Sequence, residues 1–200
     1  MVLIIDKSFR TRVLPSGTPC YSSSAVYFDK NVYCFGGRYN VMSSAPLSER
    51  FDLDKNRWIK LTPMPKADFH CSSIAFNGNI LISGFFNRNL LLYSIDMDSF
   101  STISYDFTEN KQKLLLNAWR LYLIEFRGGM VYESEAGNEY SWERVADSII
   151  RGHDPGQICW SYNKCGIYIG EEYFDGRSSH FKYFRFDLIS KAMKKIVRKL

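Results

Sequence analysis

Short runs of apolar residues, bounded by turn residues, follow one another along the chain. Residues 25–37, AVYFDKNVYCFGG, hold two runs around Asp29-Lys30, and residues 73–84, SIAFNGNILISG, hold two around Asn77-Gly78. Both pairs stand where a two-residue hairpin turn needs positive φ, and Asn-Gly is the strongest short-range signal for such a turn. Residues 159–170, CWSYNKCGIYIG, are a third version. The pattern therefore predicts pairs of strands joined by tight hairpins.

A second pattern follows each pair. Residues 49–61, ERFDLDKNRWIKL, place apolar side chains at Phe51, Leu53, Trp58 and Leu61. The same spacing returns at Tyr93, Ile95, Phe100 and Ile103, and again at Phe186, Leu188, Met193 and Ile196. A weaker version occupies residues 111–129 and 139–145, where Trp142 and Val145 keep the last step. The end of the chain, MKKIVRKL, also fits an amphipathic helix, but its alignment with Trp58 and Leu61 favours a strand.

Each unit thus contains four strands, and units of about 40–50 residues with turn residues between them are typical of a β-propeller. We expect an all-β fold in which residues 1–200 form a single array. Residues 3–15 align with residues 51–63 and are expected to form the outer strand of an incomplete blade. The array is then a partial propeller of about four blades plus an orphan N-terminal strand, and the chain could be a fragment of a longer protein. The repeats are expected at residues 22–65, 66–103, 111–145 and 156–196.

Several of these residues resemble the kelch repeat. The first unit carries the glycine pair, the aromatic-Asp step, the Trp, and a PMP segment followed by His-Cys-Ser, at Gly36-Gly37, Phe51-Asp52, Trp58, 63–65 and 70–72. The resemblance implies a kelch-type β-propeller in which Trp58, Phe100, Trp142 and Met193 pack between blades. The later units depart from it, because Gly84-Phe85 and Gly170-Glu171 replace the glycine pair and Gly128-Gly129 comes late.

Composition agrees with a folded domain, since 46% of residues are hydrophobic and 16% aromatic. The net charge of +5 comes from the C-terminal residues Lys191, Lys194, Lys195, Arg198 and Lys199. The neutral remainder argues against a nucleic-acid partner, and the lack of a long apolar run argues against a membrane span. The five cysteines form no C-x-x-C pair, which favours a reducing, cytoplasmic location.

The chain offers little catalytic chemistry. Its three histidines, His70, His153 and His180, are far apart in sequence and have no Cys or carboxylate at the spacing of metal ligands. Residues 52–56 open like a calcium loop, but Arg57 and Pro63 occupy positions that the loop reserves for Gly and Glu. We therefore expect neither a metal nor another cofactor, and no enzyme activity. The alternative is a kelch-type propeller enzyme, either an oxidase or a sugar isomerase.

One feature suggests binding. Each unit has an arginine in the loop after its second strand, and equivalent propeller loops emerge on one face. Aromatic rings accompany these arginines, and Arg pairs bidentately with carboxylates. The arrangement predicts a non-enzymatic protein-interaction scaffold that binds a protein or peptide with an acidic segment. The resemblance to kelch proteins implies that such a scaffold is the substrate-recognition part of a larger adaptor. The alternative is that these are ordinary surface arginines. Self-association through the open propeller edge is a further expectation. The predicted binding residues are Arg38, Tyr39, Phe86, Arg88, Arg127 and Arg177.

Overall fold

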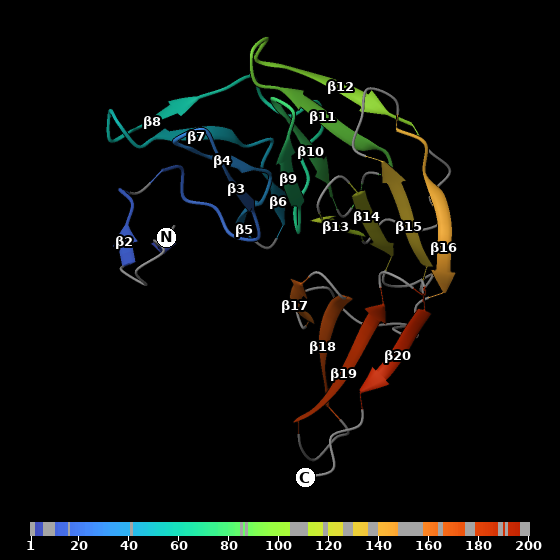
Figure 1. Ribbon diagram of the computed structural model, residues 1–200. Helices are drawn as coiled ribbons and strands as arrows, with labels where there is room; N and C mark the ends of the chain where they lie inside the picture. The colour runs from blue at the N-terminus through green and yellow to red at the C-terminus, as the bar shows by residue number, and fades with distance from the viewer. Residues whose placement is uncertain are drawn as a thin grey trace. The chain divides into compact units, whose positions relative to one another are not determined.

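The computed structural model shows a chain built of β-strands (Figure 1). Among the described residues no helix is long and apolar enough to cross a membrane. The chain forms two compact units, residues 1–82 with 91–101 and residues 83–90 with 102–200. The structure describes residues 3–5, 11–15, 17–40, 42–84, 86, 88–104, 112–117, 120–125, 130–135, 140–147, 158–163, 166–174, 179–187, 190 and 192–196.

Four antiparallel sheets of four strands each account for most of the described chain. In every sheet the strands lie side by side in chain order, so each connects to its neighbour directly. The first sheet contains β3 (Ser24–Phe28), β4 (Asn31–Phe35), β7 (Ser48–Asp52) and β8 (Arg57–Lys60). The second contains β9 (Ser72–Phe76), β10 (Asn79–Ser83), β11 (Leu90–Ser94) and β12 (Ser99–Ile103).

The third and fourth sheets have the same order. The third contains β13 (Gln112–Asn117), β14 (Arg120–Glu125), β15 (Met130–Glu135) and β16 (Glu143–Asp147). The fourth contains β17 (Ile158–Asn163), β18 (Gly166–Phe174), β19 (Ser179–Asp187) and β20 (Ala192–Ile196). The strand at the end of the chain is thus confirmed over a helix, since Met193 pairs with Phe186. Four sheets of this kind confirm the all-β class.

The tight hairpins form where the sequence places them. Asp29 and Lys30 have φ of 40° and 58°, and Asn77 and Gly78 have φ of 47° and 71°. Positive φ at both central residues is the geometry whose twist matches that of the flanking strands. The turn residues therefore set the strand register locally, with Phe28 opposite Asn31 in the first sheet.

A turn after the third strand also recurs. Asp52 Oδ1 accepts a hydrogen bond from the backbone N of Lys55 at 2.9 Å. The equivalent Ser94 Oγ accepts from Met97 N at 3.4 Å, and Asp187 Oδ1 accepts from Ser190 N at 2.9 Å. Short polar side chains favour such local turns. The Asp of the aromatic-Asp step therefore closes the turn between the third and fourth strands.

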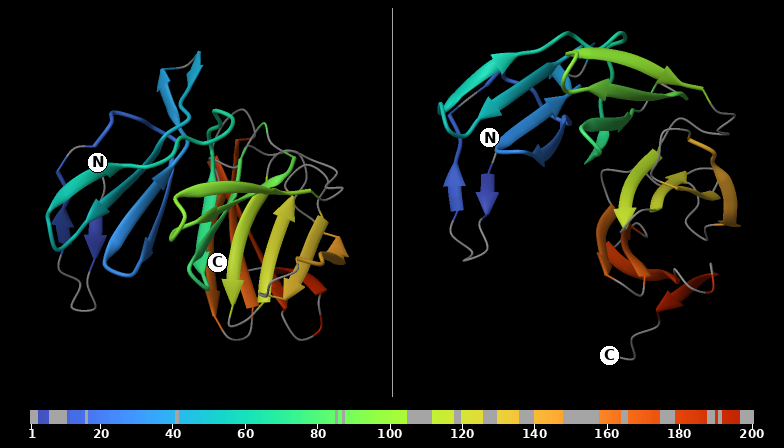
Figure 2. Two further views of the ribbon diagram at one scale, coloured as in Figure 1. Left: turned by 90° about the horizontal axis from the view of Figure 1, so that it is seen from above. Right: turned by 45° about the horizontal axis from the view of Figure 1, so that its top comes forward.

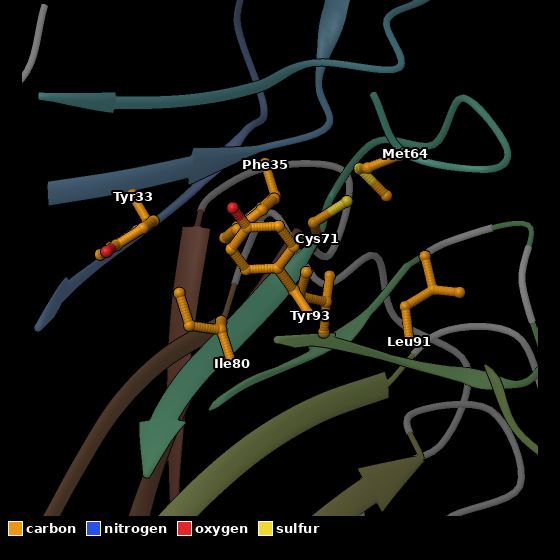
Figure 3. Close-up of a cluster of buried hydrophobic side chains, with 8 residues drawn as sticks. Tyr33, Phe35, Met64, Cys71, Ile80, Leu91 and Tyr93 are labelled. Atoms are coloured by element: carbon orange, nitrogen blue, oxygen red, sulfur yellow. The ribbon is translucent and has the colours of Figure 1, made fainter. Parts of the chain in front are cut away.

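Aromatic side chains dominate the core of the first unit (Figure 3). Phe35 is fully buried, with its ring centroid 5.3 Å from that of Tyr93 and 6.1 Å from that of Phe100. Tyr33 and Ile80 belong to the same cluster. These residues come from β4, β10, β11 and β12, so the core lies between the first and second sheets. In the second unit the rings of Tyr122 and Phe186 join the third and fourth sheets, 6.0 Å apart.

Polar contacts also hold the first two sheets together. The Tyr93 hydroxyl donates a hydrogen bond to Asp98 Oδ1 at 2.6 Å, and the backbone N of Thr62 donates to the same oxygen at 3.0 Å. Burial raises the pKa of Asp98, but the hydrogen bonds from Tyr93 and Thr62 together lower it by more. The pKa of Asp98 therefore lies below its usual value. The ionised carboxylate is thus the form that the fold stabilises.

We expect Asp98→Asn to lower stability in a pH-dependent way. A carboxyl with a lowered pKa contributes stability above its unfolded value of 3.8, and this contribution is lost as pH falls through the folded pKa. Asn tolerates the positive φ of 45° at this position, so the backbone should be unaffected. Urea unfolding should show a gap between wild type and variant at pH 7 that narrows below about pH 3.8. A gap that is constant with pH would contradict the assigned role.

One expectation is corrected. Residues 3–15 do not form one strand, because β1 (Leu3–Ile5) and β2 (Thr11–Val13) pair with each other antiparallel in a two-stranded sheet. In the fourth sheet, where Gly170-Glu171 replaces the glycine pair, the second strand continues to Phe174.

Trp58 packs against the N-terminal segment but is less buried than a place between blades implies. It is only half-buried, packing edge-on against Phe51 with ring centroids 5.3 Å apart. Its Nε1 donates a hydrogen bond to the carbonyl of Pro15 at 2.7 Å. The segment before the first sheet covers this face only in part, which explains the exposure. Trp142, which directly precedes β16, is buried instead.

Candidate interaction face

Arg38 lies at the end of the first sheet that carries the connection between β4 and β7. Its backbone exchanges two hydrogen bonds with Tyr21, Tyr21 N to Arg38 O at 3.1 Å and Arg38 N to Tyr21 O at 2.8 Å. The guanidinium carbon lies 3.2 Å from the ring centroid of Phe69, within cation–π distance. The cation is therefore held by a segment that precedes the first sheet and by one that precedes the second.

The glycine pair before Arg38 makes this arrangement possible. Gly36 and Gly37 have φ of 64° and 111°, a region that L side chains rarely adopt. Gly37 N donates to the carbonyl of Asp68 at 2.7 Å. A Cβ on Gly36 would lie 2.4 Å from Cys71 Sγ, and one on Gly37 would lie 2.3 Å from Cys20 Sγ. Both positions need glycine for conformation and for close approach.

Exposed apolar side chains surround Arg38. Tyr39 is 51% exposed, Tyr21 is 45% exposed and Met42 is 93% exposed. Tyr39 and Met42 belong to a small hairpin of β5 (Arg38–Asn40) and β6 (Ser43–Ser44), in which Asn40 Oδ1 accepts a hydrogen bond from Met42 N at 2.9 Å. Figure 2 shows this light-blue hairpin standing out from the end of the first sheet. We call Arg38, Tyr39, Tyr21 and Met42 the loop-end patch.

The other predicted binding residues are placed only in part. Phe86 is 48% exposed and Arg88 is exposed, and both follow β10 in a connection that belongs to the second unit. Arg127 and Arg177 lie outside the described residues. The structure therefore brings together Arg38 and Tyr39, and the convergence of all four arginines stays a prediction.

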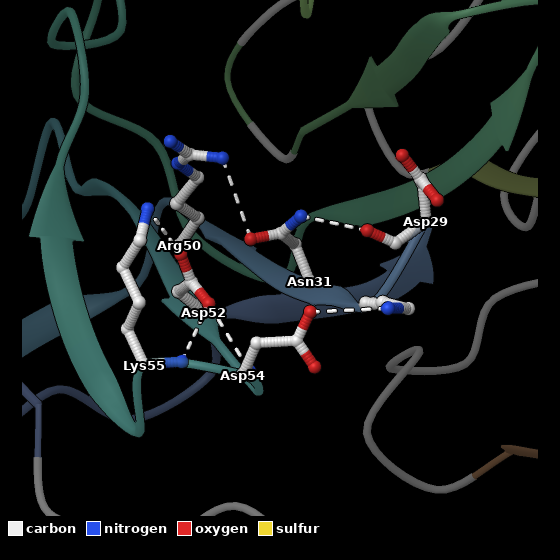
Figure 4. A network of polar contacts seen from close by, with 7 residues as sticks. Asp29, Asn31, Arg50, Asp52, Asp54 and Lys55 are labelled. Carbon is white, nitrogen blue, oxygen red and sulfur yellow. Dashed lines mark hydrogen bonds and ion pairs between the residues drawn. The ribbon is translucent and has the colours of Figure 1, made fainter.

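The opposite end of the first sheet carries many charges, but they neutralise one another (Figure 4). Lys30 Nζ lies 3.1 Å from Asp54 Oδ2, and Lys55 Nζ lies 3.2 Å from Asp52 Oδ2. The backbone N–H of Lys55 is the main cause of the lowered pKa of Asp52. These charges stabilise turns, which makes this end the weaker candidate for binding.

A cavity of about 430 Å³ lies on the first sheet, and sequence reasoning missed it. Its buried acid is Glu49, which accepts hydrogen bonds from the backbone N of Thr18 at 3.1 Å and from the Thr18 hydroxyl. The sequence contains one signal for this cavity. Glu49 lies two positions before Phe51, which places an acidic side chain on the same face of the strand as a core residue. We call it the Glu49 cavity. It is lined by Pro15, Gly17, Thr18, Pro19, Cys20, Tyr21, Ser23, Cys34, Tyr39, Leu47, Glu49 and Trp58.

Cysteines near these sites are free thiols. Cys20, Cys34 and Cys71 form no disulfide among the described residues. Burial raises the pKa of Cys34 to about 12, with Glu49 adding to the effect, so this thiol is neutral at physiological pH. No group of three or more His, Cys, Asp or Glu side chains in the described part of the chain could hold a metal ion.

Comparison with known proteins identifies the repeat. A family model described as the Kelch motif matches residues 19–65, the range that contains the glycine pair, Phe51 and Trp58. Residues 19–65 therefore carry a kelch motif. Kelch repeat protein C2 of Vaccinia virus (strain Western Reserve) is 32% identical over 66 residues, which cover 32% of this chain and 13% of that protein.

Two other matches extend over more of the chain. Spermatocyte protein spe-26 of Caenorhabditis elegans is 27% identical over 166 residues, 72% of this chain and 29% of that protein. The chain therefore spans less than a third of either relative. A solved structure, "Structure of YjhT", matches with a TM-score of 0.75 at 15% identity, over 95% of this chain and 74% of that one. This likeness confirms the fold, a kelch-type propeller of about four blades.

Proposed function

We propose that this chain is a non-enzymatic scaffold that binds an acidic segment of a partner protein at the loop-end patch. Kelch repeats suggest a protein-interaction scaffold. The acidic character of the partner follows from Arg38, whose planar guanidinium suits carboxylates. Within a longer protein, such a module would serve as the substrate-recognition part of an adaptor.

The observation that carries this proposal is the way in which Arg38 is held. Its backbone is tied to Tyr21 and its guanidinium carbon lies 3.2 Å from the ring centroid of Phe69, so the side chain loses little freedom when a partner binds. Beside it, Tyr39 and Tyr21 offer exposed rings. Arg and Tyr are enriched among the residues that dominate binding energy. A preorganised cation with two neighbouring rings therefore fits an acidic segment that also contains apolar side chains.

Arg38→Glu should weaken binding of a fluorescein-labelled deca-glutamate peptide by about tenfold, because it replaces a charge-assisted contact with repulsion. Fluorescence anisotropy at several salt concentrations measures the effect, and wild-type affinity should fall as salt rises. Arg57→Glu is the matched control, since Arg57 is exposed and starts β8 at the opposite end of the sheet. Equal losses in both variants would contradict a site at the loop-end patch.

Two further measurements separate this proposal from its alternatives. Lys195→Glu, in β20, should change peptide affinity far less than Arg38→Glu. A loss as large as that of Arg38→Glu would mean non-specific attraction to the basic C-terminal segment. Metal analysis and a screen for oxidase and sugar-isomerase turnover test the enzyme alternative. Stoichiometric copper or a reproducible product would contradict the proposal that the protein is not an enzyme.

A further inference from the structure

The Glu49 cavity lies on the face of the first sheet that carries Val32, Cys34 and Phe51. The other face, with Tyr33 and Phe35, packs against the second sheet. Leu14 joins the cluster on the cavity side, and Pro15, Gly17 and Thr18 line the cavity. Its volume, about 430 Å³, is within the range of small-molecule sites. The cavity is therefore a feature of the first unit alone.

Among the described residues that line the cavity, Glu49 is the one with a charged side chain. Its side chain belongs to a residue that is only 6% exposed, and both carboxylate oxygens accept hydrogen bonds from Thr18. No ion pair to Glu49 occurs among the described residues. A buried carboxylate with hydrogen bonds but no counter-ion favours any cation that can reach it.

An aromatic face lies beside this carboxylate. A Cβ built on Gly17 would lie 2.9 Å from Trp58 Cε2 and 3.0 Å from Glu49 Oε2, so Gly17 packs closely against both groups, and both also line the cavity. The hydrogen bond from Trp58 Nε1 to the carbonyl of Pro15 fixes the orientation of the indole ring. Tyr21 and Tyr39 also line the cavity. An indole face is the best aromatic partner for an organic cation.

The two thiols of the cavity add no charge that would compete. Cys20 and Cys34 both have raised pKa values, caused first by burial, so both thiols are neutral near pH 7. The interior therefore combines a single negative charge with aromatic and apolar walls. Acidic ligands are excluded by the same charge.

We propose that the Glu49 cavity is a binding site for an organic cation, an alkylammonium or guanidinium group, with Glu49 as counter-ion and Trp58 as the aromatic wall. The cation is either a free amine or the end of a lysine or arginine side chain of a partner. The site differs from the loop-end patch in charge preference, although Tyr21 and Tyr39 belong to both. The first blade would then bind two classes of ligand, an acidic segment at the loop-end patch and an organic cation in the Glu49 cavity.

Isothermal titration calorimetry of the full chain with n-butylammonium chloride tests the proposal, with 1-butanol as the neutral probe of equal length. We expect saturable binding of butylammonium and none of 1-butanol over the same concentrations. Glu49→Gln keeps the shape of the side chain and removes its charge, and should weaken butylammonium binding at least tenfold. Equal binding of the two probes, or equal affinity in wild type and Glu49→Gln, would overturn the proposal.

Gly17→Ala provides a second variant that leaves Glu49 unchanged. The new methyl group would clash with both Trp58 and Glu49 and displace them from their positions in the cavity wall, so we expect loss of butylammonium binding. Glu135→Gln is the matched control, since its side chain is 84% exposed on the third sheet, and it should bind as wild type does. Circular dichroism checks that each variant folds. The comparison of butylammonium with 1-butanol uses wild-type protein alone, so it tests the proposal even if a variant does not fold.

Peptides distinguish the two sources of the cation. A short acetylated and amidated peptide with one central lysine is compared with the same peptide carrying norleucine. Tighter binding of the lysine peptide than of butylammonium identifies a side chain of a partner, and weaker binding identifies a free amine. Either result requires Glu49, whereas lysine and norleucine peptides that bind alike would contradict a cation site. Arg38→Glu should leave these affinities unchanged or raise them slightly.

Discussion

Gly36→Ala is expected to destabilise the protein by about 2–4 kcal/mol. Two costs add at this position. With φ of 64°, an L side chain is strained, and the added methyl would lie 2.4 Å from Cys71 Sγ and 2.7 Å from the carbonyl oxygen of Asp68. The second contact is with backbone, so rotation of a side chain cannot relieve it. Urea unfolding followed by fluorescence measures the loss.

Gly78→Ala is the matched control for this experiment. Gly78 has a similar φ of 71°, but nothing lies within 4 Å of a Cβ built there. Only the conformational cost remains, about 1 kcal/mol. If Gly36→Ala lost no more stability than Gly78→Ala, the result would contradict the close contact of Gly36 with Asp68 and Cys71, which precede the second sheet.

Phe35→Ala should cost about 3–5 kcal/mol, because it removes a fully buried ring and leaves a cavity between the first two sheets. The rings of Tyr93 and Phe100 would lose their partner, at 5.3 Å and 6.1 Å between centroids. Such contacts add to the free energy of burial. Urea unfolding of the variant, compared with wild type under the same conditions, gives the difference.

Trp58→Ala serves as the comparison, since it removes a larger ring that is only half-buried. We expect it to cost about 1–3 kcal/mol, through partial burial and the lost hydrogen bond to Pro15. A loss larger than that of Phe35→Ala would show that the Trp58 face is covered more fully than the structure indicates. The ranking of the two variants therefore tests which face of the first sheet is the better packed one.

Much of the fold follows from the sequence because its causes are local. Asp29-Lys30 and Asn77-Gly78 form tight turns since few residue pairs adopt positive φ at both positions. The alternation of apolar residues then assigns Tyr33 and Phe35 to one face of β4 and Val32 and Cys34 to the other. Repetition of the aromatic spacing identified the kelch repeat for the same reason. It was weakest in the third unit, where the loop before Trp142 is longer.

The candidate sites could be predicted only in part. Arg38 and Tyr39 were found because they follow a recognisable glycine pair, but the stacking of Arg38 on Phe69 depends on a segment from the next repeat. Periodicity does not encode such contacts between repeats. The number of arginines that share one face likewise depends on how the units are arranged.

What the sequence determined by itself is the strand order, the turns and the inward aromatic residues, all of which depend on neighbours a few positions away. Only the tertiary structure decided that Trp58 is half-buried and that β1 and β2 pair with each other. It also decided that Glu49 meets Thr18 beside an indole ring. These features depend on how the segment before the first sheet lies on it, and the spacing of residues within a repeat does not encode contacts between segments that are far apart in sequence.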